Sequence, residues 1–282
     1  MQKNLRMSLS KRDSKTIWHP LTQHKTAKLP LAISKAKAAL LYDENGKEYI
    51  DAISSWYTAM YGHCNDYILE SAFKQMQILD QVVFTGFTHE PAVKLAEELL
   101  SILPKNQAKV MFNDNGSTSV EIGIKMALQF HHNNNDKRDT LLAFENGFHG
   151  DTFGAMSVSG LSVYNGPFDD HFLKVVRIPT PDGTNNAEVL KQLNALIETH
   201  NIAGFVYEPL VQGAAGMKMY DAQGLNEILK ICKTNKIITV ADEVMTGFGK
   251  TGTYFASLNI KELPDVICLS KALTAGLVPM GI

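Results

Sequence analysis

Apolar and polar positions alternate along most of the chain in two patterns. Short apolar runs, such as residues 140–145 and 202–210, are typical of buried strands. Between them, in 189–200 and 224–236, apolar residues recur every three or four positions, which is typical of helices. Apolar strands separated by helices predict an α/β fold, with a mainly parallel sheet and helices on both of its faces.

The same reading gives the expected elements and their division. The stretch 40–52 predicts two short strands joined at Asn45-Gly46, a strong hairpin signal. We expect an N-terminal segment over residues 1–60 and a large, ligand-binding domain over 61–282. Further strands are predicted at 110–114, 140–145, 202–210, 237–244 and 266–269, and helices at 68–79, 91–100, 120–130, 189–200 and 224–236.

Composition narrows the class of protein. The chain is 45% hydrophobic and 20% charged with a net charge of −2, which fits a globular protein and gives no electrostatic reason to expect nucleic acid or a membrane surface. Its three cysteines are widely spaced, which suggests neither disulfides nor zinc and favours the cytoplasm. No stretch approaches the roughly 20 apolar residues of a membrane span. The basic leader, residues 1–15, favours an exposed tail over an organelle-targeting signal.

In a parallel sheet, ligands bind beyond the carboxyl ends of the strands, so the residues that follow each apolar run are the candidates. After 110–114 come Gly116 and Ser117, at the predicted start of a helix where free N–H groups attract an anion such as a phosphate. Thr118 and Glu121 have the spacing of a capping box. An ordinary capped helix explains the same residues.

Two further strand ends carry candidate side chains. Phe148 and His149 stand between glycines, where an aromatic ring can lie against a flat heterocycle or pack within a loop. Glu208 and Gln212 end the next strand. The polar run 131–136 is interpreted as solvated, without a metal site.

The last strand ends present carboxylates and an amine. Asp242 and Glu243 need a cation, a metal or a proton-bearing partner, since an unpaired buried charge is unfavourable. The run 247–252 is similar to a P-loop but lacks its first glycine and its strand–loop–helix frame. Lys271 follows an apolar strand, where partial desolvation turns a lysine into a nucleophile toward carbonyls. An amine, an acid, an aromatic ring and an anion site together match the needs of pyridoxal 5′-phosphate.

From Ile17 onward the chain resembles a known family, the class III, fold-type I aminotransferases. DEVMTGFGKTG at 242–252 and SKAL at 270–273 are shared widely in that family, whereas IWHP near the start and HGDTFGAMSV are more discriminating. The other matching motifs are IWHPLTQ at 17–23, ISSWYTAMYGH at 53–63, TGFTHEPA at 85–92, GSTSVEIGIKMALQ at 116–129 and EPLVQGAAGM at 208–217.

The resemblance implies a role for each candidate. Lys271 would bind the cofactor covalently and later move a proton, and Asp242 would pair with the pyridine nitrogen. Gly116 and Ser117 would hold the phosphate. The remaining residues would contact the cofactor ring or the substrates: Phe148 and His149 at the ring, and Trp56, Phe148, Leu21, Glu208 and Gln212 on the substrate side. Leu21 and Phe148 depart from the family, which has an aromatic residue and a tyrosine at these positions.

The matching motifs are most similar to family members that act in biotin synthesis. They imply a homodimeric, cytoplasmic enzyme that transfers an amino group from S-adenosylmethionine, or lysine in some relatives, to 8-amino-7-oxononanoate. Two alternatives stay open. One is another ω-amine aminotransferase, acting on ornithine or 4-aminobutyrate, and the other is a non-catalytic fragment that binds a cofactor or partner.

The end of the chain carries a separate expectation. The resemblance implies that the family continues beyond Ile282 with a small C-terminal domain, absent here, so we interpret the sequence as truncated. We expect the final run, 276–282, to have nothing to pair against, and the chain by itself to expose apolar surface and to be inactive.

Overall fold

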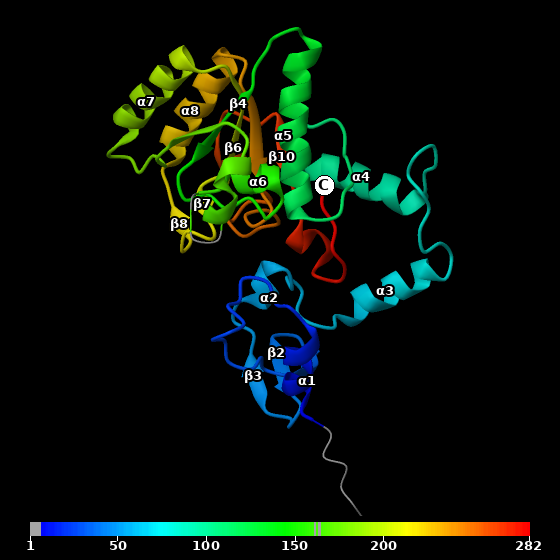
Figure 1. Ribbon diagram of the computed structural model, residues 1–282. Coiled ribbons are helices and arrows are strands. Elements are labelled where there is room, and N and C mark those ends of the chain that lie inside the picture. The colour runs from blue at the N-terminus through cyan, green and yellow to red at the C-terminus, as the bar shows by residue number, and fades with distance from the viewer. Residues whose placement is uncertain (1–6, 161, 163–164) are drawn as a thin grey trace, which may run out of the picture. The chain divides into compact units, whose positions relative to one another are not determined.

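The computed structural model describes residues 7–160, 162 and 165–282, and it divides into two compact units (Figure 1). One unit reaches to Val82, and the other runs from Val83 to Ile282. The predicted division between residues 60 and 61 lies inside the first unit and stays a prediction. Of the basic leader, the first six residues lie outside the described part, and the rest enters a helix without buried residues, α1 (Leu9–Thr16).

The first unit contains a small antiparallel sheet. The predicted hairpin is confirmed, because β2 (Leu40–Asp43) and β3 (Glu48–Ile50) pair around Gly46, whose φ of 83° suits glycine. The Asp43 carboxylate closes the turn by accepting the N–H groups of Asn45 and Lys47. The unit is completed by β1 (Ile33–Lys37), which pairs with β2, by the short turn α2 (Ser54–Tyr57) and by α3 (Asp66–Met76).

The second unit is built on a five-stranded sheet in the order β10-β9-β6-β4-β5, in which every neighbouring pair is parallel. This confirms the predicted parallel sheet. Its strands are β4 (Thr140–Phe144), β5 (Val175–Ile178), β6 (Ile202–Tyr207), β9 (Ile238–Asp242) and β10 (Val266–Cys268).

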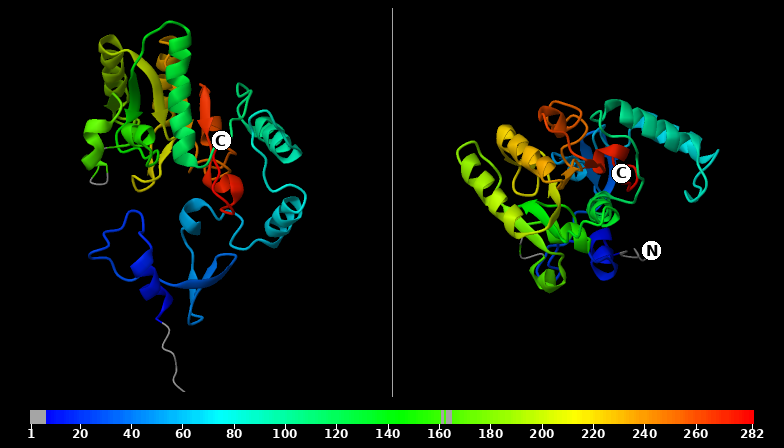
Figure 2. Two further views of the ribbon diagram at one scale, coloured as in Figure 1. Left: turned by 45° about the vertical axis from the view of Figure 1, so that its right-hand side comes forward. Right: turned by 90° about the horizontal axis from the view of Figure 1, so that it is seen from above.

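Helices cover both faces of this sheet (Figure 2). Alternate residues of β4 show why: Leu141 and Ala143 pack toward α5 and α6, whereas Leu142 and Phe144 pack toward α7 and α8. Both strand faces are therefore buried, which explains the continuous apolar runs. The helices are α4 (Glu90–Ile102), α5 (Gly116–Asn133), α6 (Phe153–Val158), α7 (Asn186–Thr199) and α8 (Ala222–Thr234). Shorter elements are β7 (Val211–Gln212), β8 (Lys218–Met219) and the 3-10 helices Gly166–His171, Ala256–Asn259 and Lys271–Thr274.

The predicted strand at 110–114 is wrong, because only Asn113 forms a β-bridge there, with Gly281. The Asn113 side chain accepts the hydroxyl protons of Thr118 and Ser119. Polar side chains that bond locally in this way compete with a strand ladder.

The expectation that the final run has nothing to pair against is also wrong. Ile282 exchanges both backbone hydrogen bonds with Leu269, each 2.9 Å long, and Gly281 exchanges two with Asn113. Residues 281 and 282 therefore join two segments that lie far apart in the sequence.

The interpretation of residues 131–136 as solvated fails for His131. Its ring is buried, with Nδ1 3.1 Å from the Asp136 carboxylate and Nε2 3.1 Å from the Ala203 carbonyl, whereas His132 is exposed. The contact with Ala203 attaches the end of α5 to β6.

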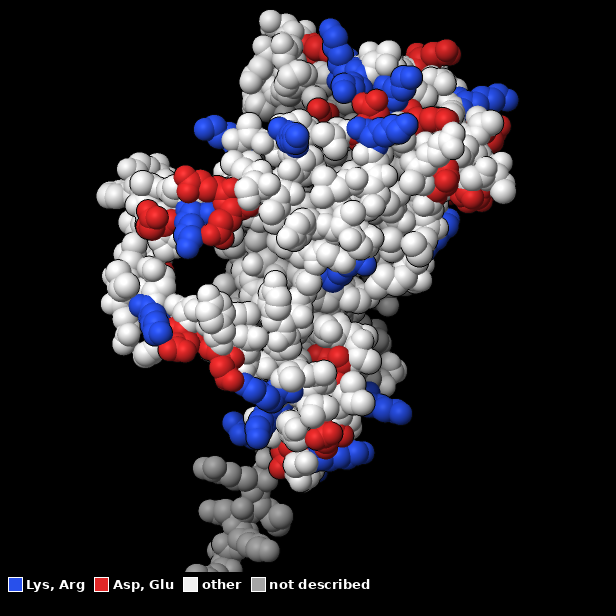
Figure 3. Space-filling view, turned by 180° about the vertical axis from the view of Figure 1, so that it is seen from behind, with Lys and Arg blue, Asp and Glu red and all other residues white. Residues whose placement is uncertain are grey.

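Charged side chains of both signs share one face of the molecule. Lys and Arg side chains are mixed with Asp and Glu on the face seen in Figure 3. Within the described ranges, no group of His, Cys, Asp and Glu is arranged to hold a metal ion. The described helices also include none with the length and apolar character needed to cross a membrane.

Candidate active site

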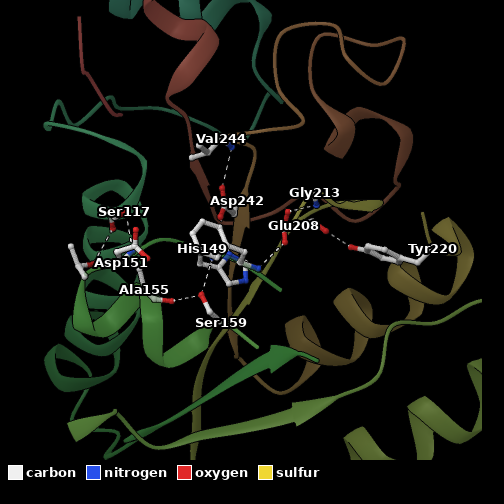
Figure 4. A network of polar contacts seen from close by, with 12 residues as sticks. Ser117, His149, Asp151, Ala155, Ser159, Glu208, Gly213, Tyr220, Asp242 and Val244 are labelled. Atoms are coloured by element: carbon white, nitrogen blue, oxygen red, sulfur yellow. Dashed lines mark hydrogen bonds and ion pairs between the residues drawn. The ribbon is translucent and has the colours of Figure 1, made fainter. Parts of the chain in front are cut away.

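A buried histidine and a buried aspartate are hydrogen-bonded to each other at the carboxyl ends of two strands of the second unit. His149 follows β4 and Asp242 ends β9, and the ring Nδ1 lies 2.8 Å from the Asp242 carboxylate (Figure 4). The other carboxylate oxygen accepts the N–H of Val244, and the N–H of His149 donates to Ser159. His149 Nε2 is buried and has no hydrogen-bond partner among the described residues. The pair fixes the direction of the carboxylate.

Glu208, at the end of β6, holds two loops of the site. Its two carboxylate oxygens accept the N–H of Phe148, at 3.0 Å, and the N–H of Gly213, at 2.8 Å. Burial raises the pKa of Glu208, His149 lowers it and Asp242 raises it further. The bond to Glu208 fixes the backbone of Phe148, and Phe148 itself is 41% exposed, so its ring is available to a ligand.

Gln212 is buried beside the same loops. Its amide N–H donates to the Glu145 carbonyl at 2.7 Å, while its Oε1 finds no partner within the described part of the chain. A carbonyl oxygen without a partner can accept a hydrogen bond from a ligand.

The start of α5 provides the anion site. The N-cap is Asn115, whose side chain accepts the N–H of Thr118 while the Thr118 hydroxyl accepts the N–H of Asn115. The predicted capping box of Thr118 and Glu121 is therefore wrong, because the helix begins earlier. Glu121 instead accepts Thr152 Oγ1 and the N–H groups of Gly154 and Ala155, which ties α5 to the start of α6.

Gly116 and Ser117 occupy the first turn of α5. A Cβ on Gly116 would lie 2.9 Å from a methyl group of Val244, so only glycine fits there. The Ser117 hydroxyl accepts the N–H of Asp151, which leaves its own proton to donate. A side chain on Gly150 would overlap Ser117, so the loop that ends β4 contacts the helix start directly.

Lys271 follows β10 and opens a 3-10 helix with φ of 47°, a left-handed conformation that is unfavourable for a lysine. Burial lowers the pKa of its amine, and the charges of Asp242 and Glu208 oppose that shift. Lys250, in the run 247–252, has its pKa lowered by burial and by Lys271. A desolvated amine near two carboxylates can attack a carbonyl group.

The structure thus gathers eight of the predicted site residues in one unit, at strand ends and at the start of α5. They are Gly116, Ser117, Phe148, His149, Glu208, Gln212, Asp242 and Lys271. Leu21 and Trp56 belong to the other unit, and both are more than half exposed.

The sequence analysis missed the supporting roles of two residues. Ser159 accepts the N–H of His149, and Glu121 accepts N–H groups at the start of α6. Neither residue stands at a strand end. Glu243, expected to need a cation, a metal or a proton-bearing partner, accepts protons from the Thr246 hydroxyl and from the N–H groups of Ala256 and Ser257.

The family model for class III aminotransferases matches residues 21–281. The chain belongs to this family. An adenosylmethionine-8-amino-7-oxononanoate aminotransferase from Synechococcus elongatus is 42% identical over 94% of the chain, and one from Staphylococcus aureus is 35% identical over 99%. The chain spans 65% of the length of each of these two relatives.

Solved structures of this aminotransferase class share the fold. The adenosylmethionine-8-amino-7-oxononanoate aminotransferase from Methanocaldococcus jannaschii superposes with a TM-score of 0.90 at 36% identity, over 97% of this chain and 64% of that one. An amine transaminase from an uncultivated Pseudomonas species, in a PLP-bound form, gives 0.86 at 29% identity, over 94% of this chain and 64% of that one. The fold is therefore the fold-type I aminotransferase fold.

Proposed function

We propose that the chain forms the cofactor-binding part of a pyridoxal 5′-phosphate enzyme that transfers an amino group from S-adenosylmethionine to 8-amino-7-oxononanoate, giving 7,8-diaminononanoate in biotin synthesis. The observation that carries the proposal is the convergence of Lys271, Asp242 and the start of α5 at one edge of the sheet. The names of the relatives from Synechococcus and Staphylococcus support this choice of substrates.

The residues present fit this cofactor. The N–H groups of Gly116 and Ser117, in the first turn of α5, and the Ser117 hydroxyl suit a phosphate. The Asp242 carboxylate, oriented by His149, suits a protonated ring nitrogen, and the exposed Phe148 ring suits a flat heterocycle. When bound, pyridoxal phosphate supplies an aldehyde and a ring that accepts electrons.

The chain's own residues would then act on substrate and proton. The Lys271 amine would hold the cofactor and, once released, take the proton from the carbon that bears the donor amine and return it to the acceptor. Asp242 would keep the ring nitrogen charged, and Glu208 would keep the Phe148 backbone in place. Trp56 and Leu21 would line the substrate side. We propose further that the enzyme works as a homodimer in the cytoplasm.

A related amine transaminase is the second candidate, because a transaminase from the marine bacterium Virgibacillus superposes with a TM-score of 0.91 at 29% identity. A panel of amines separates the two. Activity with S-adenosylmethionine or lysine and the keto acid supports the first, and activity only with ornithine, 4-aminobutyrate or another ω-amine supports the second.

Cofactor attachment is testable without turnover. The chain is mixed with pyridoxal phosphate and treated with borohydride, and its peptides are mapped. We expect the label on Lys271 and its loss in Lys271→Ala, with Lys250→Ala as the matched control that keeps it. A label on Lys250, or none, would contradict the assignment and favour a non-catalytic chain.

A further inference from the structure

The turn α2 (Ser54–Tyr57) is left-handed. Its four residues have φ of 48°, 46°, 61° and 70°, and Ser55 and Trp56 have ψ of 54° and 46°, close to the ideal left-handed helix. Side chains on L-residues disfavour this conformation, and runs of it are rare without glycine. The turn persists here with four side chains, one of them the Trp56 ring, which is 59% exposed.

Besides the backbone hydrogen bonds of the turn, one carboxylate oxygen ties it to the rest of the unit. Asp51 Oδ2 accepts the N–H of Ser55 at 2.8 Å, the Ser55 hydroxyl at 3.2 Å and His63 Nε2 at 2.7 Å. The Asp51 side chain is only 6% exposed, so water competes little for these bonds. The hydrogen bonds from His63 and Ser55 lower the pKa of Asp51, which keeps the acceptor charged.

The holding group is itself anchored to the small sheet. The N–H of Asp51 donates to Ala39, and His63 exchanges two backbone hydrogen bonds with Ala38, in the connection between β1 and β2. Gly62 makes this approach feasible, since a Cβ there would lie 2.8 Å from the Ala38 backbone. Hydrogen bonds therefore link the small sheet to the Asp51–His63 pair, and that pair to the turn.

We propose that Asp51 is a positioning residue, whose carboxylate stabilises the left-handed turn Ser54–Tyr57 and so fixes the orientation of the Trp56 side chain. All the residues that stabilise the turn in this proposal belong to the first unit. The consequence for substrate binding rests on the proposed function.

The test follows Trp56 itself. The chain has two tryptophans, so Trp18→Phe leaves Trp56 as the only one. Trp18 is 89% exposed, and its replacement should therefore disturb little packing. In that background we measure fluorescence anisotropy and acrylamide quenching. Asp51→Asn replaces a charged acceptor of three donors by a neutral one. We expect about a tenfold shift from the ordered turn to relaxed conformers, the low end for a hydrogen bond to a charged group.

Two variants complete the design. Asp66→Asn, in an exposed ion pair of the same unit, should leave the Trp56 signals unchanged. Ser55→Gly should reduce the effect of Asp51→Asn, because glycine takes the left-handed conformation without penalty. Ser55→Gly alone should keep the turn ordered, which covers the case in which Asp51→Asn fails to fold.

The outcomes separate this proposal from the proposed function. Three results would overturn the role of Asp51: unchanged Trp56 signals in Asp51→Asn, equal changes in Asp66→Asn, or an Asp51→Asn effect that Ser55→Gly does not reduce. With active enzyme, Asp51→Asn should raise the KM for the keto acid more than it lowers kcat. A chain that responds as expected in fluorescence but transaminates nothing would count against the proposed function alone.

Discussion

At the scale of single residues, the site depends on where charges are buried. Asp242 and His149 form a pair 2.8 Å long inside the second unit, and Lys271 lies close enough for Asp242 to act on its pKa. Buried charges persist only when they are paired or hydrogen-bonded. These residues can therefore hold one geometry before any ligand arrives.

Asp242→Asn should lower transamination about 100-fold, which corresponds to about 2.7 kcal/mol of transition-state stabilisation. Asparagine keeps the shape but removes the charge that we propose pairs with the cofactor's ring nitrogen. Initial rates with saturating keto acid measure the effect, and Asp139→Asn, at an exposed position, serves as the control. Near-normal turnover would assign the role to another group.

The Lys271 amine makes stability depend on pH. Its pKa is lowered in the folded chain, whereas the unfolded chain has the ordinary value of about 10.4. Between these two values the unfolded chain binds the extra proton, so the free energy of unfolding should rise with pH across that window. Below the window both states are protonated and the slope vanishes.

Urea unfolding between neutral pH and pH of about 10 measures this slope in the absence of cofactor. Lys271→Met should flatten it, and Lys230→Met, on the exposed side of α8, should not. An identical slope in Lys271→Met would show that Lys271 is not the group responsible.

At the scale of elements, helix α5 connects the sheet to the anion site. Its N-terminus presents Gly116 and Ser117, and its middle packs on β9 and β10 through Gly123. A Cβ at Gly123 would lie 2.7 Å from a methyl of Val240 and 3.4 Å from Cys268 Sγ. Helix and sheet can therefore approach this closely only because residue 123 is a glycine, without a Cβ.

Gly123→Ala should destabilise the chain by about 1–3 kcal/mol, although alanine favours helix formation elsewhere. Val240 is β-branched and adapts poorly. Thermal or urea unfolding measures the change, and a double-mutant cycle with Val240→Ala tests its cause. If the two substitutions were simply additive, the contact with Val240 would not be the reason.

At the scale of the whole second unit, three distant segments converge at the start of α5. Gly281 pairs with Asn113, Ile282 pairs with Leu269, and the Ser270 hydroxyl donates to the Met280 carbonyl. A Cβ on Gly281 would lie 2.2 Å from Asn113 Oδ1 and 2.4 Å from the Asn115 carbonyl. The N-cap of α5 and the last residues therefore support each other.

Gly281→Ala should destabilise the chain by about 2 kcal/mol and weaken pyridoxal phosphate binding, because it displaces the N-cap. Unfolding curves and absorbance titration with the cofactor measure the two effects. Gly166→Ala, where a Cβ meets nothing within 4 Å, is the matched control. Unchanged stability and affinity would show that the last residues are dispensable for the anion site.

The sequence by itself determined the type of most elements, the hairpin at Asn45-Gly46 and the strand ends that carry side chains for chemistry. Element type follows from periodicity and turn residues, which act through the local backbone. The carboxyl ends of parallel strands meet at one edge of the sheet whatever the order of the strands in it. Only the tertiary structure decided that His149 is the partner of Asp242, 93 residues away. It also decided that Asn115 caps α5, that His131 is buried and that the last two residues pair with Asn113 and Leu269. These contacts depend on strand order and on the approach of distant segments, which no local pattern of apolar and polar residues encodes.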